Sequence, residues 1–191
     1  MISILYEPLP CTIRADGREL PVLTDFRAWL KFLGLVRDEV LTAEDKAAAL
    51  ADWLLTPAPV TREVVRGLCD FCKAGELEPD PTDDDDDDKE DPPPTRVPTW
   101  DWDVDARFVL ADFRRFYAID LLRTEYLHWW EFRALFSALP PESQSMHRIG
   151  VRAMDLSKIP DKRMRQQYRD MQRRIALPFV LDDFAIGDAF G

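Results

Sequence analysis

The segment Cys69-Asp-Phe-Cys72 has the CxxC spacing found in redox pairs and in half of a zinc site. A structural zinc site needs four ligands, and the chain has no second CxxC and only two histidines, His128 and His147. The segment also falls inside an expected helix, where both sulfurs share the apolar face at positions i and i+3. We therefore predict that both cysteines pack in a core, with metal binding and redox chemistry as weaker alternatives, and we expect no metal and no cofactor.

The other residues with catalytic potential form no recognisable site. His128 has neither a nucleophile nor an orienting carboxylate at a recognisable spacing. The seven glycines are scattered singly, so the sequence has no glycine-rich phosphate loop. Asp101, Asp103 and Asp105 alternate before an expected helix, and we expect Asp103 or Asp105 to cap its N-terminus. The protein is predicted not to be an enzyme and to have no catalytic residues.

Basic residues gather near the end of the chain, although the net charge is −11. The segment 146–175 has nine basic and three acidic residues, and an amphipathic helix after Pro160 is expected to carry most of them. Arginines can bind phosphates, but Tyr168 is the only aromatic residue interleaved with them. The pattern therefore favours a solvated face or a surface for an acidic protein partner, and nucleic acid is the less favoured alternative.

The chain has six tryptophans in 191 residues, and two small helical regions do not easily bury that many. Trp, Tyr and Arg are enriched at the hot spots of protein–protein interfaces. Trp100 and Trp102 are candidates for surface anchors, and an equal alternative is that they staple the start of the following helix onto the core. The predicted partner-binding residues are Trp100, Trp102, Arg165, Tyr168, Arg169 and Arg173.

The segments that position these residues have mostly helical periodicity, so we predict a mainly α fold with a short N-terminal β-hairpin. The pair Asp16-Gly17 between two short β-prone runs predicts the hairpin. Helices are expected after caps at Thr24 or Asp25, at Thr42 and at Thr61, after Trp102, over 125–139 and 143–151, and finally with Pro160 in a first turn.

The clearest boundary is the segment 76–98, which has eleven acidic residues, two basic residues and six prolines. Repulsion among its aspartates and its small apolar content predict a disordered linker. We expect helical subdomains at 1–75 and 99–177, joined by this linker and followed by a tail at 178–191. We expect no signal peptide, since the first residues have no positive region and no small-residue cleavage site, and the sequence has no apolar run that spans a bilayer. Its three cysteines fit a reducing cytosol.

Five strings of the sequence are distinctive: 24–30 (TDFRAWL), 101–106 (DWDVDA), 113–121 (FRRFYAIDL), 127–135 (LHWWEFRAL) and 152–159 (RAMDLSKI). In order and spacing they resemble the bacteriophage "gene product fifteen" family of long-tailed phages and prophages of Gram-positive bacteria. The likeness covers residues 1–75 and 100–177. The acidic segment 76–98 departs from the compact form of that family.

The resemblance implies a tail-assembly chaperone that binds the tape-measure protein and the major tail protein, with self-association or a companion chaperone as further partners. It implies action in the host cytoplasm during assembly, no membrane partner and absence from the mature virion. The family has no agreed catalytic residues. Two alternatives stay open: a minor structural tail or connector protein kept in the virion, and an acidic DNA-mimicking inhibitor of a host enzyme. The second is weaker because most of the negative charge lies in 76–98.

Overall fold

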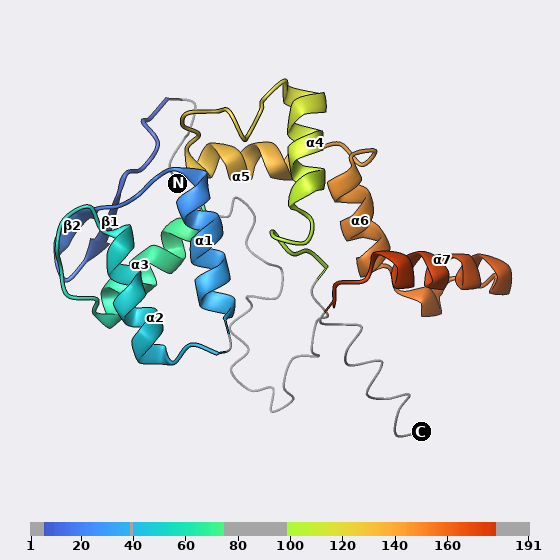
Figure 1. Ribbon diagram of the computed structural model, residues 1–191, viewed down its shortest axis with the longest axis horizontal. Coiled ribbons are helices and arrows are strands. Elements are labelled where there is room, and N and C mark those ends of the chain that lie inside the picture. Colours follow the sequence, from blue (N-terminus) through green and yellow to red (C-terminus); the bar gives the residue numbers. More distant parts are fainter. Residues whose placement is uncertain (1–5, 39, 75–98, 179–191) are drawn as a thin grey trace. The chain divides into compact units, whose positions relative to one another are not determined.

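The computed structural model describes residues 6–38, 40–74 and 99–178, which form one two-stranded sheet and seven α-helices (Figure 1). This confirms the mainly α fold with an N-terminal hairpin. The elements form two units: unit 1 combines Met1–Asp85 with Glu125–Ser137, and unit 2 combines Asp86–Thr124 with Ala138–Gly191. The predicted disordered linker lies outside the described residues, as does most of the expected tail. None of the described helices is long and apolar enough to cross a membrane.

The hairpin consists of β1 (Thr12–Ala15) and β2 (Arg18–Pro21), which pair in antiparallel fashion. Its turn residues Asp16 and Gly17 have φ angles of +50° and +70°. A two-residue hairpin turn of this type needs a positive φ at both positions, which glycine adopts without strain. The backbone N–H of Asp16 also donates to the carboxylate of Glu63 at 2.6 Å, so the turn is fixed against the start of a helix.

Side-chain caps fix the start of each of the next three helices. The capped helices are α1 (Phe26–Arg37) after Asp25, α2 (Ala43–Leu50) after Thr42 and α3 (Arg62–Cys72) after Thr61. At α1, Asp25 rather than Thr24 is the cap, because its carboxylate accepts the N–H of Arg27 at 3.0 Å. At α2 the predicted cap at Thr42 is confirmed, and Thr42 forms a capping box with Asp45; a short 3₁₀ turn, Ala51–Trp53, follows the helix directly.

The helix α5 (Trp129–Ser137) packs in unit 1, whereas the sequence division grouped it with the C-terminal region. Its Phe132 stacks on Phe26 of α1 with ring centroids 4.8 Å apart, and Trp129 stacks on Trp29 at 6.4 Å. The side chains of Trp29, Trp129 and Phe132 are fully buried. Periodicity identifies the apolar face of α5, but it does not identify the helices that cover this face.

Unit 2 contains α4 (Ala106–Tyr117), α6 (Gln144–Ala153) and α7 (Lys162–Ile175), with a 3₁₀ turn, Leu156–Lys158, before α7. Its buried apolar residues are Val109, Phe113, Leu121, Leu139, Val151 and Leu177. The carboxylate of Asp161 accepts the N–H of Met164 at 2.6 Å and caps α7. Pro160 therefore lies before the cap, and its predicted place in the first turn is wrong, because the carboxylate that follows it starts the helix.

Candidate functional site

Two of the distinctive strings meet in unit 1, although they are about one hundred residues apart in the chain. The backbone N–H of Phe26 donates to the carbonyl of Leu127 at 3.0 Å, and Asp25 pairs with His128 in an isolated antiparallel bridge. The carboxylate of Asp25 also accepts the N–H of Leu127 at 3.4 Å. The starts of α1 and α5 are thus held together by main-chain hydrogen bonds.

His128 acts as a helix cap in this bridge. Its Nδ1 accepts the N–H of Trp130 at 3.1 Å, which assigns the proton to Nε2, and Nε2 donates to the carbonyl of Pro10 at 2.9 Å. The residue is 5% exposed, and burial lowers the pKa of the imidazole against opposing effects of the Pro10 carbonyl and Glu131. Both ring nitrogens are used by the fold, so the ring offers no free nitrogen for acid–base chemistry.

Two indole groups of α5 cover the end of α3. The Nε1–H of Trp129 donates to the carbonyl of Cys72 at 2.8 Å, and that of Trp130 donates to the carbonyl of Phe71 at 3.0 Å. The last carbonyls of a helix lack their usual partners within the helix, and these two bonds supply donors there, in addition to the N–H of Ala74 that the Phe71 carbonyl accepts at 3.0 Å. The paired tryptophans of unit 1 therefore have a structural role.

The CxxC cysteines lie on α3, with Cys72 buried and Cys69 half-buried. Burial raises the pKa of the Cys69 thiol, Asp70 raises it further, and Lys73 lowers it. A raised thiol pKa is the opposite of what a reactive thiolate requires. Within residues 6–38, 40–74 and 99–178, no group of three or more His, Cys, Asp or Glu side chains is placed to hold a metal ion.

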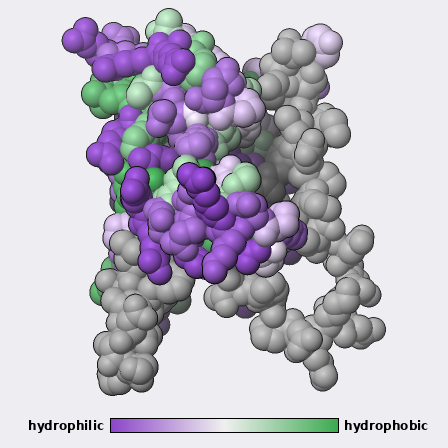
Figure 2. All heavy atoms as spheres, turned by 90° about the vertical axis from the view of Figure 1, so that its right-hand side faces the viewer, coloured by the Kyte–Doolittle hydropathy of each residue, from purple (hydrophilic) through white to green (hydrophobic). Residues whose placement is uncertain are grey.

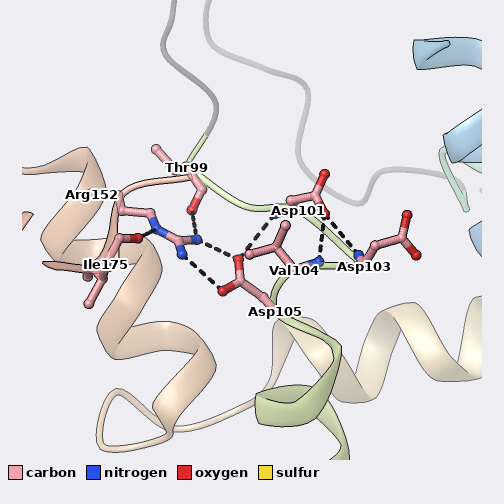
Figure 3. Close-up of polar contacts among 7 residues, drawn as sticks. All are labelled: Thr99, Asp101, Asp103, Val104, Asp105, Arg152 and Ile175. Carbon is pink, nitrogen blue, oxygen red and sulfur yellow. Dashed lines mark hydrogen bonds and ion pairs between the residues drawn. The ribbon is translucent and has the colours of Figure 1, made fainter. Parts of the chain in front are cut away.

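A buried ion pair joins the start of α4 to α6 (Figure 3). The guanidinium of Arg152 donates to both carboxylate oxygens of Asp105, at 2.5 and 2.9 Å, and the two side chains are 6% and 1% exposed. The same guanidinium donates to the carbonyls of Thr99 at 3.1 Å and Ile175 at 2.7 Å. Arg152 therefore ties the segment before α4 and the end of α7 to α6.

The predicted N-cap of α4 is confirmed at Asp105, but the capping hydrogen bond expected of its side chain is absent. Asp105 stands at the N-cap position, but its carboxylate accepts no helix N–H and binds Arg152 and the N–H of Asp101 instead. The carboxylate of Asp101 accepts the N–H groups of Asp103 and Val104, which shapes the turn before the helix (Figure 3). A buried guanidinium from a distant segment thus competes successfully with the local N–H groups.

Asp112 of α4 caps a different helix, and the sequence analysis missed it. Its carboxylate accepts the N–H groups of Gln144 at 3.1 Å and Ser145 at 2.8 Å, the first two residues of α6. Ser143 adds the ordinary cap by accepting the N–H of Met146 at 3.2 Å. Asp112 is 2% exposed. An aspartate beside Phe113 on the apolar face of a helix was the available signal, because buried carboxylates need strong donors.

The helix α7 carries four of the six predicted partner-binding residues. Arg169 and Arg173 are exposed, whereas Arg165 donates to the carbonyl of Ile159 at 2.9 and 2.6 Å and is half-buried. No residue of α7 is buried. Figure 2 views the molecule from the side of α7, where hydrophilic side chains cover most of the described surface.

An apolar cavity lies beside this basic surface. Tyr168 lines a cavity of about 460 Å³ together with Met146, Gly150, Val151 and Met154, all of unit 2. On α7, Met164 and Met171 stand four residues before and three after Tyr168, which places them on the same helix face. They are 49% and 37% exposed. The predicted partner residue Tyr168 thus belongs to an apolar strip whose two methionines are exposed.

Trp100 and Trp102, the remaining predicted partner residues, are half-buried in unit 2. Their rings meet edge to face with centroids 5.7 Å apart. Mutual contact of this kind is compatible with a staple at the start of α4 and with an aromatic anchor for a partner. Both interpretations stay predictions.

A comparison with known families gave one match. The family model described as Bacteriophage Gp15 protein matches residues 5–177, a range that includes parts of both units and all five distinctive strings. Comparisons with curated proteins and with solved structures gave no significant match.

Proposed function

Because the chain belongs to the Bacteriophage Gp15 protein family, we propose that this phage structural or morphogenesis protein is a non-catalytic tail-assembly chaperone. In this proposal the protein binds the tape-measure protein and the major tail protein in the host cytoplasm. It leaves before the virion is complete. The resemblance of the sequence to that family predicted the membership, and the chaperone role is the more specific part of what that resemblance implies.

The observation that carries the proposal is the open face of α7. This helix buries no residue, and it combines exposed arginines with an apolar strip of Met164, Tyr168 and Met171. Methionine side chains adapt to irregular partners, and helices commonly dock in grooves of this kind. The groups with most catalytic potential, His128, Asp105 and Asp112, are instead used by the fold.

The use of the carboxylates supports a chaperone over a DNA mimic. A mimic of DNA needs carboxylates spread over its folded surface at phosphate-like spacing. In the described part of the chain, several carboxylates accept backbone N–H groups at helix starts, namely those of Asp25, Asp45, Asp112, Asp155 and Asp161. That of Asp105 is buried in an ion pair. These groups stabilise the protein rather than imitate a phosphate backbone.

The test is to isolate a tagged form of this protein from infected or induced cells and to identify the bound proteins by mass spectrometry. Finished particles are analysed in parallel. The proposal expects capture of the tape-measure and tail-tube proteins and no copy of this protein in the particles. Its presence in finished particles would reassign it as a minor tail or connector protein. Capture of a host restriction or repair enzyme instead would reassign it as an inhibitor.

A further inference from the structure

We propose that the groove formed by α6 and α7 is the docking site for an acidic amphipathic helix of a partner protein. The groove consists of the cavity lined by Met146, Gly150 and Val151 on α6 and Tyr168 on α7, extended along α7 by its two exposed methionines. This inference deepens the proposed function and rests on it, because it names the chemistry of the partner segment that the chaperone holds.

The apolar part of the groove fits a helix rather than a small polar ligand. A volume of about 460 Å³ with a mainly apolar lining accepts several apolar side chains. Met164, Tyr168 and Met171 follow the spacing i, i+4 and i+7, so they form a strip along α7. A partner helix meets such a strip with its own residues at i, i+3, i+4 and i+7.

The charge around the groove selects an acidic partner. The helix α7 has six basic residues and one acidic residue, Asp170. Four of its arginines are exposed: Arg163, Arg169, Arg173 and Arg174. By helical periodicity Arg163 and Arg174 flank the apolar strip, and Arg169 and Arg173 lie on the far face of α7. Among the residues that the structure describes, none of these four lies within salt-bridge distance of a carboxylate. Glutamates flanking the apolar face of a partner helix would complement these charges.

A nucleic acid fits this surface less well than a peptide. Single-stranded nucleic acid binds on aromatic platforms between basic residues, and α7 has one aromatic residue, Tyr168. Two of the three residues of the strip, Met164 and Met171, are methionines, which an apolar side chain covers better than a phosphate backbone does.

Direct binding to a designed probe tests the inference on the full chain. The probe is a labelled 18-residue peptide with leucines on one helical face and glutamates elsewhere, and its control has lysines in place of the glutamates. By fluorescence anisotropy, we expect the glutamate peptide to bind at least about tenfold more tightly, with an affinity that falls as salt screens the charges. Replacing both Arg163 and Arg174, which flank the strip, by glutamine should weaken binding of the glutamate peptide several-fold. The same change at Arg169 and Arg173, on the far face of α7, should weaken it less.

A pair of glycines supplies matched variants. A Cβ added to Gly150 or to Gly34 of α1 meets no heavy atom within 4 Å, so both positions have open space where a side chain would start. Gly150 lines the groove and Gly34 does not. Gly150→Trp should fill the groove and reduce peptide affinity at least tenfold, and Gly34→Trp should leave it unchanged. Both variants should keep the circular dichroism spectrum and melting temperature of the wild type.

Several results would overturn the inference. Equal affinity for the glutamate and lysine peptides, or binding that Gly150→Trp leaves intact, would separate the peptide from this groove. Tighter binding of single-stranded DNA that Gly150→Trp abolishes would assign the groove to nucleic acid. Self-association lost in Gly150→Trp would assign it to a second copy, and full competition by a peptide of residues 179–191 would assign it to the chain's own end. The two proposals can fail separately. A negative peptide experiment does not change which proteins are captured from cells, and failed capture in cells does not change the measured peptide affinity.

Discussion

Replacing Arg152 by methionine should destabilise unit 2 because the change leaves a carboxylate charge in the interior. The guanidinium makes two hydrogen bonds to Asp105 and one each to the carbonyls of Thr99 and Ile175, and all four are lost. Methionine retains much of the apolar stem, so the loss of stability reports mainly on the polar contacts.

The expected loss is large relative to the stability of a domain. Removing one partner of a buried ion pair costs about 3–5 kcal/mol, and whole domains are stable by about 5–15 kcal/mol. Asp105 is 1% exposed at its side chain, so water does not screen its charge, and the N–H of Asp101 is the donor that remains. The double variant Asp105→Leu with Arg152→Met removes both charges and should regain most of the loss.

Urea unfolding followed by circular dichroism measures these free energies, and hydrogen exchange locates the loss in α4, α6 and α7. The matched control is Arg114→Met in the same unit, which breaks the ion pair with Asp120 at 2.7 Å. The side chains of Arg114 and Asp120 are 49% and 27% exposed, so Arg114→Met should lower the free energy of unfolding by less than about 1 kcal/mol. An equally small loss for Arg152→Met, or a double variant no more stable than the single one, would refute the reasoning.

Three further changes test other contacts. Asp112→Ala should cost about 2 kcal/mol and speed hydrogen exchange at the first amides of α6, while Asp112→Asn, which keeps an acceptor, should cost less. Burial lowers the pKa of His128 in the folded protein below its value of about 6.5 in the unfolded chain. The contribution of His128 to the free energy of unfolding should therefore be complete above pH ~6.5, and it should be lost as the pH falls through the pKa of the folded state. Urea unfolding at neutral pH and near pH 5 measures this loss of stability. The loss should be smaller in His128→Asn, and it should be unchanged in His147→Asn, because His147 is exposed. Trp130→Phe removes the donor to the Phe71 carbonyl and should cost about 1 kcal/mol in a melting experiment, and Trp129→Phe, in the fully buried position, should cost more.

The local features of the fold were predictable because neighbouring residues determine them. The Asp16-Gly17 turn follows from backbone conformations that few residues adopt, and Thr42 with Asp45 satisfies N–H groups within one helical turn. A cap such as Thr61 needs an oxygen at the right position and nothing from elsewhere in the chain. Spacing alone therefore identified these starts.

The distant partners were not predictable from spacing. The carboxylate of Asp105 had several N–H groups within reach of its own segment, yet it binds a guanidinium 47 residues away. Asp112 caps a helix that begins 32 residues later. The choice between a local and a distant donor depends on which groups become buried together, and a single sequence does not state this. The basic face of α7 was predictable from composition, but the apolar cavity beside it was not, because α6 and the segments on either side of it supply all of the lining except Tyr168.

The place of α5 in unit 1 affects how the protein folds during synthesis. The hydrogen bond from Trp129 to the Cys72 carbonyl closes a loop of 57 residues, and loop closure of that length costs roughly 3–4 kcal/mol of chain entropy. A nascent chain that ends before α5 leaves Phe26 and Trp29 without their stacking partners and the end of α3 without its indole donors. Unit 1 is therefore completed only after the ribosome has made most of the chain. For the same reason, a cut within 76–98 of the folded protein would yield two fragments that stay joined through α5.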